Sequence, residues 1–145
     1  MINVGAIMTP RRELVVMAPS DSLDTASRAM TEQHIHHVPI LDGGGKLVGV
    51  VSHRDVLAAA APGRRGAPTE SSSIRLSDIM SPAPETVPSN CGIRHAALRL
   101  QALGIGCLPV VDDTGLAGIV TDTDFVAVAI NLLEQLEEVE PVRSE

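Results

Sequence analysis

Aromatic side chains are almost absent from this sequence, which has no Trp, no Tyr and a single Phe, Phe125. Proteins that bind single-stranded nucleic acid or methylated lysine usually stack the ligand on several aromatic rings. Basic residues are also scarce, since the 145-residue chain has a formal net charge of −7, whereas a nucleic-acid-binding protein usually presents a basic face. The sequence therefore disfavours a nucleic-acid partner.

Long apolar runs and clustered cysteines are lacking as well. No run approaches the ~20 apolar residues that a transmembrane helix needs, so we expect no membrane span. Met1–Pro10 has no basic stretch followed by an apolar one, so it does not resemble a secretory signal. We therefore expect a cytoplasmic protein in which Cys91 and Cys107 are free thiols with no metal-site spacing.

Sequence motifs of enzymes are missing from the chain too. It contains no GxSxG, HExxH, P-loop or Rossmann fingerprint. Cys91 follows Asn90 at an expected helix start, where a thiolate can be stabilised, and His95 lies four residues further on. A thiol-based redox sensor is thus one hypothesis, but catalysis as such has little support.

An internal repeat organises the chain. Three short motifs each occur twice, in the same order. Ala6–Pro10 recurs as Asp78–Pro82, His37–Asp42 as Cys107–Asp112, and Gly49–Asp55 as Gly118–Asp124. We place repeat one at residues 1–61, a Gly-, Pro- and Ser-rich linker at 62–73, repeat two at 74–133, and an acidic helix end and tail at 134–145.

Each repeat is predicted to run strand, helix, strand, strand, helix. The strands are short apolar runs, the helices begin near Ser or Asn residues that can act as N-caps, and Gly-rich turns join the paired strands. In repeat one the predicted elements are a strand at Leu14–Met17, a cap at Ser20–Ser22, a helix from Leu23, and strands at Val38–Leu41 and Leu47–Val51. Their counterparts are a cap at Ser89–Asn90, a helix from Ile93, and strands at Leu108–Val111 and Ala117–Val120.

The last predicted helix is the longest. Apolar residues recur from Phe125 to Leu136 at positions i, i+3, i+4, i+7, i+8 and i+11, which makes a wide apolar stripe. One small repeat cannot cover so long a stripe. We therefore predict that part of it packs on a second subunit, giving a homodimer.

The order of these motifs resembles the cystathionine-β-synthase (CBS) domain, and two in tandem resemble a CBS pair, or Bateman module, from about Val4 to about Leu133. The resemblance implies an α+β fold of two β-α-β-β-α repeats packed about a pseudo-two-fold axis. It also implies a regulatory module that binds AMP, ADP, ATP, S-adenosylmethionine or a similar adenosine-containing ligand, with no required cofactor and no catalysis. The chain would then be a stand-alone sensor or an adaptor for a separate protein target.

The resemblance assigns ligand-binding roles to Ser52 with Asp55, and to Thr121 with Asp124. Each pair lies where a strand meets a helix, whose N-terminus favours phosphate, and a carboxylate can accept from both hydroxyls of a ribose. The same Ser/Thr-x-x-Asp spacing is also a capping box, in which these side chains bind the helix's own backbone. Capping alone would make the module a ligand-free interaction scaffold.

The intervening residues differ between the two pairs. Arg54 can bind phosphate with a charged, forked donor, whereas Asp122 places a negative charge at the corresponding end of repeat two. We therefore predict that Ser52 and Asp55 belong to the stronger phosphate site.

Contacts with adenine are implied by the resemblance for two further stretches, mainly through backbone and aliphatic groups. These are Met8, Thr9, His37, Val38 and Pro39, and Met80, Ser81, Cys107, Leu108 and Pro109. Core packing is the alternative for the methionines, and a strand-edge position for the prolines.

Four histidines, His34, His36, His37 and His53, fall close together in repeat one. If His34 and His36 lie on one strand they share a face, which would permit a metal site. No Cys, Asp or Glu stands nearby at ligand spacing, so the patch can equally contain a histidine that responds to pH near neutrality.

Overall fold

The computed structural model describes residues 2–61 and 73–139. Residues 62–72 of the predicted linker and 140–145 of the predicted tail lie outside the described residues. The elements are η1 (Val4–Ala6), β1 (Thr9–Pro10), η2 (Arg11–Glu13), α1 (Leu23–Gln33), β2 (His37–Leu41), β3 (Leu47–Ser52) and α2 (His53–Ala60), then η4 (Leu76–Asp78), β4 (Ser81–Pro82), α3 (Ile93–Leu103), β5 (Cys107–Asp112), β6 (Gly115–Thr121) and α4 (Asp122–Val139).

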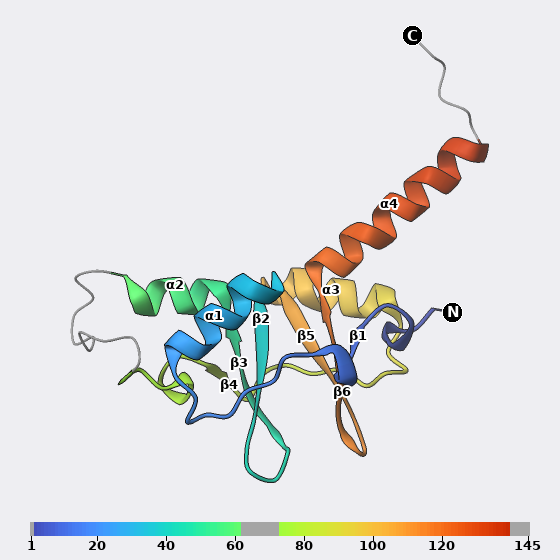
Figure 1. Ribbon diagram of the computed structural model, residues 1–145. Helices are drawn as coiled ribbons and strands as arrows, with labels where there is room; N and C mark the ends of the chain where they lie inside the picture. The colour runs from blue at the N-terminus through green and yellow to red at the C-terminus, as the bar shows by residue number, and fades with distance from the viewer. Residues whose placement is uncertain (1, 62–72, 140–145) are drawn as a thin grey trace.

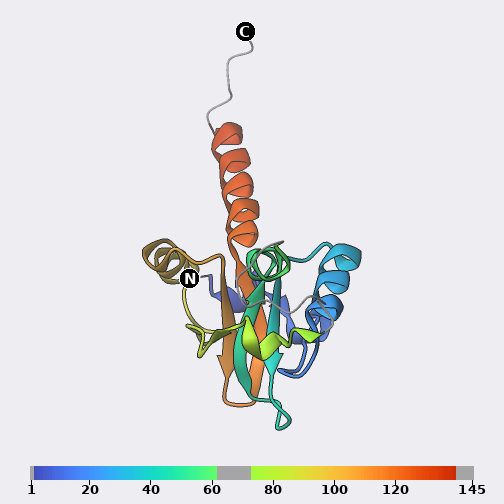
Figure 2. The ribbon, with the colours of Figure 1, turned by 90° about the vertical axis from the view of Figure 1, so that its left-hand side faces the viewer.

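Two antiparallel three-stranded sheets form the centre of the molecule, with α1 and α3 on opposite sides of the strands (Figures 1 and 2). Their strand orders are β2-β3-β4 and β1-β6-β5, so each sheet takes its short outer strand from the other repeat. Thr9 pairs with Ile119 in one sheet, and Ser81 pairs with Val50 in the other. This exchange joins the two repeats through backbone hydrogen bonds as well as through side chains.

The hydrophobic cores repeat the exchange. Leu76, from the start of repeat two, packs with Leu23 and Ile40 of repeat one, and Val4 packs with Leu100 and Leu108 of repeat two. A third cluster, Val50, Cys107 and Ile119, contains residues of both sheets. The backbone N–H of Leu23 donates to the Ile74 carbonyl and that of Ile93 to the Ile2 carbonyl, so matching contacts recur about a pseudo-two-fold axis, as predicted.

Helix α1 and both hairpins agree with the sequence pattern. Leu23, Ala26 and Met30 form the buried face of α1, and the Ser22 hydroxyl caps it by accepting from the Thr25 N–H at 3.2 Å. Gly45 and Gly115, with φ of 83° and 109°, occupy the left-handed region in the two hairpin turns, where a Cβ atom would be strained.

Two local predictions were wrong. Leu14–Met17 is not a strand, because only Met17 forms a bridge, with Ile40. Ser89 and Asn90 do not cap α3, whose N-cap is Gly92 without a side-chain bond. The Ser89 N–H instead donates to Asp112 Oδ1 at 2.9 Å, a partner 23 residues away that local sequence does not reveal.

Helix α4 extends away from the body of the molecule (Figure 1). Its apolar side chains beyond Phe125 are largely uncovered, and Leu136 is 63% exposed. Among the helices of residues 2–61 and 73–139, none is both long and apolar enough to cross a membrane.

Candidate functional site

The N-terminus of α2 carries the first predicted pair. Ser52 Oγ accepts from the Asp55 N–H at 3.0 Å, and Asp55 Oδ2 accepts from the Ser52 N–H at 2.8 Å. These two bonds form a complete capping box, as the local pattern predicts. Neither of these two bonds uses Asp55 Oδ1, and Asp55 also lines the cleft described next.

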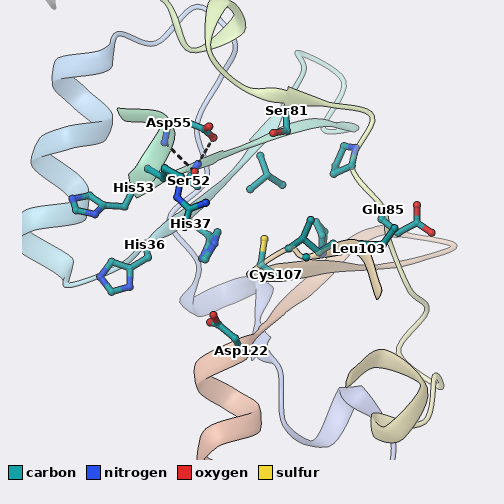
Figure 3. A pocket seen from close by; sticks show the side chains of 17 residues that line it. His36, His37, Ser52, His53, Asp55, Ser81, Glu85, Leu103, Cys107 and Asp122 are labelled. Carbon is teal, nitrogen blue, oxygen red and sulfur yellow. Dashed lines mark hydrogen bonds between the residues drawn. The ribbon is translucent and has the colours of Figure 1, made fainter. Parts of the chain in front are cut away.

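A cleft of about 780 Å³ opens beside this helix end, between the two repeats. Its walls come from β2, β3, β4 and α2 on one side, and from the end of α3, β5 and the start of α4 on the other. Figure 3 shows Ser52 and Asp55 with Ser81 on one side of them and Cys107 and Asp122 across the opening. The volume lies within the ~300–1,000 Å³ that is usual for small-molecule sites.

Seven of the predicted ligand-binding residues line this cleft. They are His37, Ser52, Arg54, Asp55, Ser81, Cys107 and Pro109. Repeat one and the first part of repeat two thus meet at one site, because β4 pairs with β3 while β5 faces them from the other sheet.

The remaining predicted residues lie elsewhere. Val38 and Leu108 are fully buried in the cores, and Met8 and Met80 pack against those cores, so the packing interpretation holds for the methionines. Pro39 is buried on the edge strand β2, and Pro109 occupies the matching edge strand β5. Thr9 pairs with Ile119 in the sheet.

Thr121 and Asp124 also lie outside the cleft lining, at the start of α4. Asp124 Oδ2 accepts from the Thr121 N–H at 2.8 Å, which is half of the predicted capping box. The Thr121 hydroxyl bonds instead to Asp124 Oδ2 at 3.2 Å and to the Thr123 hydroxyl at 3.0 Å. The two helix starts therefore differ in structure as well as in sequence.

Sequence reasoning did not predict that the carboxylates of Glu85 and Asp122 line the cleft. Glu85 forms an ion pair with Arg99 of α3. Asp122 faces His37 and Cys107, and its charge acts on both groups. From the sequence, Asp122 stands out only as an unfavourable charge beside Thr121. No local pattern indicates that the start of α4 reaches the cleft beside α2.

The histidines occupy different kinds of position. His37 lies on β2, and burial lowers its pKa below the usual 6.5, although Asp122 opposes this shift. His36 and His53 are exposed at the rim, with ring centroids 5.6 Å apart and planes tilted by 37°. His34 is not on a strand, as the metal hypothesis required, but is the left-handed C-cap of α1. In the described ranges no three His, Cys, Asp or Glu residues are grouped so that they could hold a metal ion.

The Cys107 thiol lines the cleft but has low reactivity as a nucleophile. Burial, followed by the charge of Asp122, raises its pKa to about 12. Cys91 is a half-buried free thiol, and its Sγ lies 3.5 Å from the Gly92 carbonyl oxygen.

Comparison with known proteins identifies the architecture. The sequence model of the CBS domain matches residues 4–62 and again 76–131. The chain belongs to the CBS domain family. Its two repeats form a CBS pair, and CBS-pair proteins are generally regulatory modules.

Several relatives share most of this CBS pair. CBSX2, a chloroplastic CBS domain-containing protein of Arabidopsis thaliana, is 31% identical over 158 residues, covering 93% of this chain and 66% of CBSX2. The chain thus spans just under two thirds of that relative's length. The crystal structure of CBSX2 in complex with AMP is 34% identical with a TM-score of 0.79, covering 91% of this chain and 98% of that one.

Two further structures are similar. A Vibrio cholerae protein assigned to acetoin utilization (AcuB) is 39% identical with a TM-score of 0.79, covering 97% of this chain and 99% of that one. The CBS pair of MJ0100, in complex with 5′-methylthioadenosine and S-adenosylmethionine, is 25% identical with a TM-score of 0.78, covering 90% and 98%.

Proposed function

We propose that this CBS pair is a non-enzymatic regulatory module that binds an adenosine-containing ligand in the cleft beside α2. The observation that carries the proposal is the arrangement of Ser52, Arg54, Asp55 and Ser81 on one wall and Cys107 and Pro109 on the other. Similar CBS pairs have been crystallised with AMP and with S-adenosylmethionine, which supports the same ligand class here.

The wall at α2 supplies groups suited to a ribose phosphate. Arg54 presents a charged fork to phosphate oxygens, beside the positive end of the helix dipole. Asp55 Oδ1, which the capping box does not use, can accept from ribose hydroxyls, and the Ser52 hydroxyl can donate while its lone pair continues to cap the helix. Capping and ligand binding therefore use different atoms of the same pair.

The facing wall suits a base. Leu103, Ile105 and Pro109 are apolar, and Cys107 stays a neutral thiol because its pKa is about 12. Such a surface holds an adenine ring by shape and by backbone hydrogen bonds, with few side-chain donors. The Thr121 and Asp124 pair is the weaker candidate, since its hydroxyl and carboxylate bond to each other.

The ligand would act by population shift. A molecule that bridges both walls favours the arrangement of the repeats in which the walls are close, and a separate protein target can read that arrangement. AMP, ADP, ATP and S-adenosylmethionine are the candidates. In this proposal no cofactor is required, and the module acts in the cytoplasm.

A thermal melt reported by a dye tests the proposal, because the chain has no Trp or Tyr for intrinsic fluorescence. A ligand at ~100 times its Kd adds about 2.7 kcal/mol, which raises Tm by roughly 5–11 °C for a chain of this size. We expect this rise with adenosine ligands and none with GTP, and its loss in Asp55→Ala but only a partial loss in Asp124→Ala. Equal losses in the two variants would contradict the ranking of the sites.

We further propose that the exposed apolar stripe of α4 packs on a second copy of the chain. Leu132, Leu133 and Leu136 of this stripe are each more than half exposed. Light scattering should give twice the 15.2 kDa chain mass, and Leu133→Glu should halve it. Gln135→Glu adds the same charge on the polar side and should leave the mass unchanged. A monomeric wild-type mass at micromolar concentration would contradict the dimer.

The second candidate function is a ligand-free interaction scaffold. The complete capping box at Ser52 and Asp55 favours it, because capping explains both residues without a ligand. If millimolar nucleotide does not change Tm in the thermal melt, this second function is supported.

A further inference from the structure

The cleft contains few permanent positive charges for a site that would hold phosphate. Within the described part of the chain, Arg54 is the single Lys or Arg among its lining residues, against the carboxylates of Asp55, Glu85 and Asp122. Arg99 pairs with Glu85 from outside the lining. With neutral histidines, the cleft therefore carries more negative than positive charge.

Three histidines also line the cleft. His37 lies on the inner wall, and Figure 3 shows its ring directed toward Asp122. A Cβ atom on Gly106 would lie 3.1 Å from His37 Nε2 and 3.7 Å from Asp122 Oδ2, so both groups meet over the same glycine. His36 and His53 stand together at the rim beside Arg54.

We propose that His37, on the inner wall across from Asp122, makes this cleft a proton-linked anion site, which takes up a proton when it binds a phosphorylated ligand. The proposal rests on the nucleotide-binding function proposed above and adds its regulation. Phosphate affinity then rises as pH falls, and the pocket discriminates ligands by charge.

The physical basis is mutual stabilisation of opposite charges. A bound anion favours the imidazolium form of a nearby histidine, and by linkage the imidazolium favours the anion. The groups that face His37 are Asp122 of α4 and Asp55 of α2, which favour its protonation, and His36 of its own segment, which opposes it. Cys107 of β5 remains neutral across this range because its pKa is about 12.

The sign depends on ligand charge. For an anionic ligand such as AMP, Kd falls as the pH falls from 8 to 6. A one-unit rise of the His37 pKa on binding would lower Kd by about tenfold at most, and that limit is reached only below both pKa values. For S-adenosylmethionine, whose sulfonium centre is cationic, the same protonation opposes binding, so its Kd rises over the same interval.

Isothermal titration calorimetry tests the inference with AMP and S-adenosylmethionine at pH 6, 7 and 8, in two buffers of different ionisation enthalpy. The wild-type protein is compared at each pH with His37→Gln. His95→Gln, on the exposed face of α3 and outside the cleft lining, is the matched control. The phosphate of AMP titrates near pH 6 itself, but this contribution is common to all the proteins.

We expect net proton uptake with AMP, a several-fold tightening from pH 8 to pH 6 beyond that of His37→Gln, and the opposite trend with S-adenosylmethionine. The His95→Gln protein should match the wild type. Binding with identical pH profiles in the wild type and His37→Gln would overturn the inference and leave the proposed function intact. No binding of either ligand at any pH would overturn both.

Discussion

Gly49 lies against Met80 so closely that a Cβ atom at Gly49 would be 2.5 Å from the methionine Sδ and 3.0 Å from the Ser81 carbonyl oxygen. The same relationship recurs between Gly118 and Met8, at 2.7 Å from Sδ. Each glycine thus allows the short strand of the other repeat to pair closely with the strand that contains the glycine. The glycines of the repeated motif are explained by this close approach.

Substitution of Gly49 should weaken the joint between the repeats. Gly49→Ala places a methyl group against backbone as well as side-chain atoms, and such overpacking typically costs about 1–3 kcal/mol. We expect that loss in the free energy of unfolding by urea denaturation. Gly43→Ala is the control, because a Cβ atom there meets nothing within 4 Å. Similar stability of the two variants would show that β4 shifts to accommodate the added methyl group at little energetic cost.

Ser52 should contribute to both stability and binding, and Ser22 to stability alone. Both hydroxyls cap helices, α2 and α1 respectively, so each Ser→Ala change should cost ~1 kcal/mol. Only Ser52 lines the cleft. Parallel measurement of the urea midpoint and the AMP Kd should therefore show weaker binding in Ser52→Ala but not in Ser22→Ala. If AMP binds equally well to both variants, the Ser52 hydroxyl only caps its helix.

The ligand-free protein should lose stability on mild acidification. Burial lowers the pKa of His37 in the folded state below its unfolded value of 6.5. The unfolded chain therefore binds more protons as pH falls through and below 6.5, and this part of the stability is lost. Tm measured from pH 8 to pH 5.5 should fall less in His37→Gln than in the wild type. An equal fall in both proteins would assign the loss to other groups.

The two thiols should differ in reactivity. With a pKa of about 12, Cys107 has a thiolate fraction of only about 10⁻⁴ at pH 8. A disulfide reagent such as Ellman's should therefore label the native Cys91→Ser protein very slowly, and rapidly only after denaturation. Rapid labelling of that native variant would mean that the cleft wall opens readily and exposes Cys107.

The sequence was sufficient wherever the determining interactions are local. The capping box at Ser52 and Asp55, the cap at Ser22 and the two hairpins follow from residue types at fixed short spacings. The repeat itself also pointed to a CBS pair, and the family comparison confirmed this. Ser89 shows where local patterns fail. It does not cap the expected helix end, because its N–H donates to Asp112 instead.

Long-range packing decided the rest. The pairing of Thr9 with Ile119 and of Ser81 with Val50 places each short strand in the sheet of the other repeat, and local patterns carry no signal for such pairing. The same packing brings Asp122 across to His37 and so sets the charge of the cleft. The helices and hairpins could therefore be predicted from sequence, because short-range hydrogen bonds determine them. The residues of the cleft could not, because distant segments contribute them and only the folded chain brings those segments together.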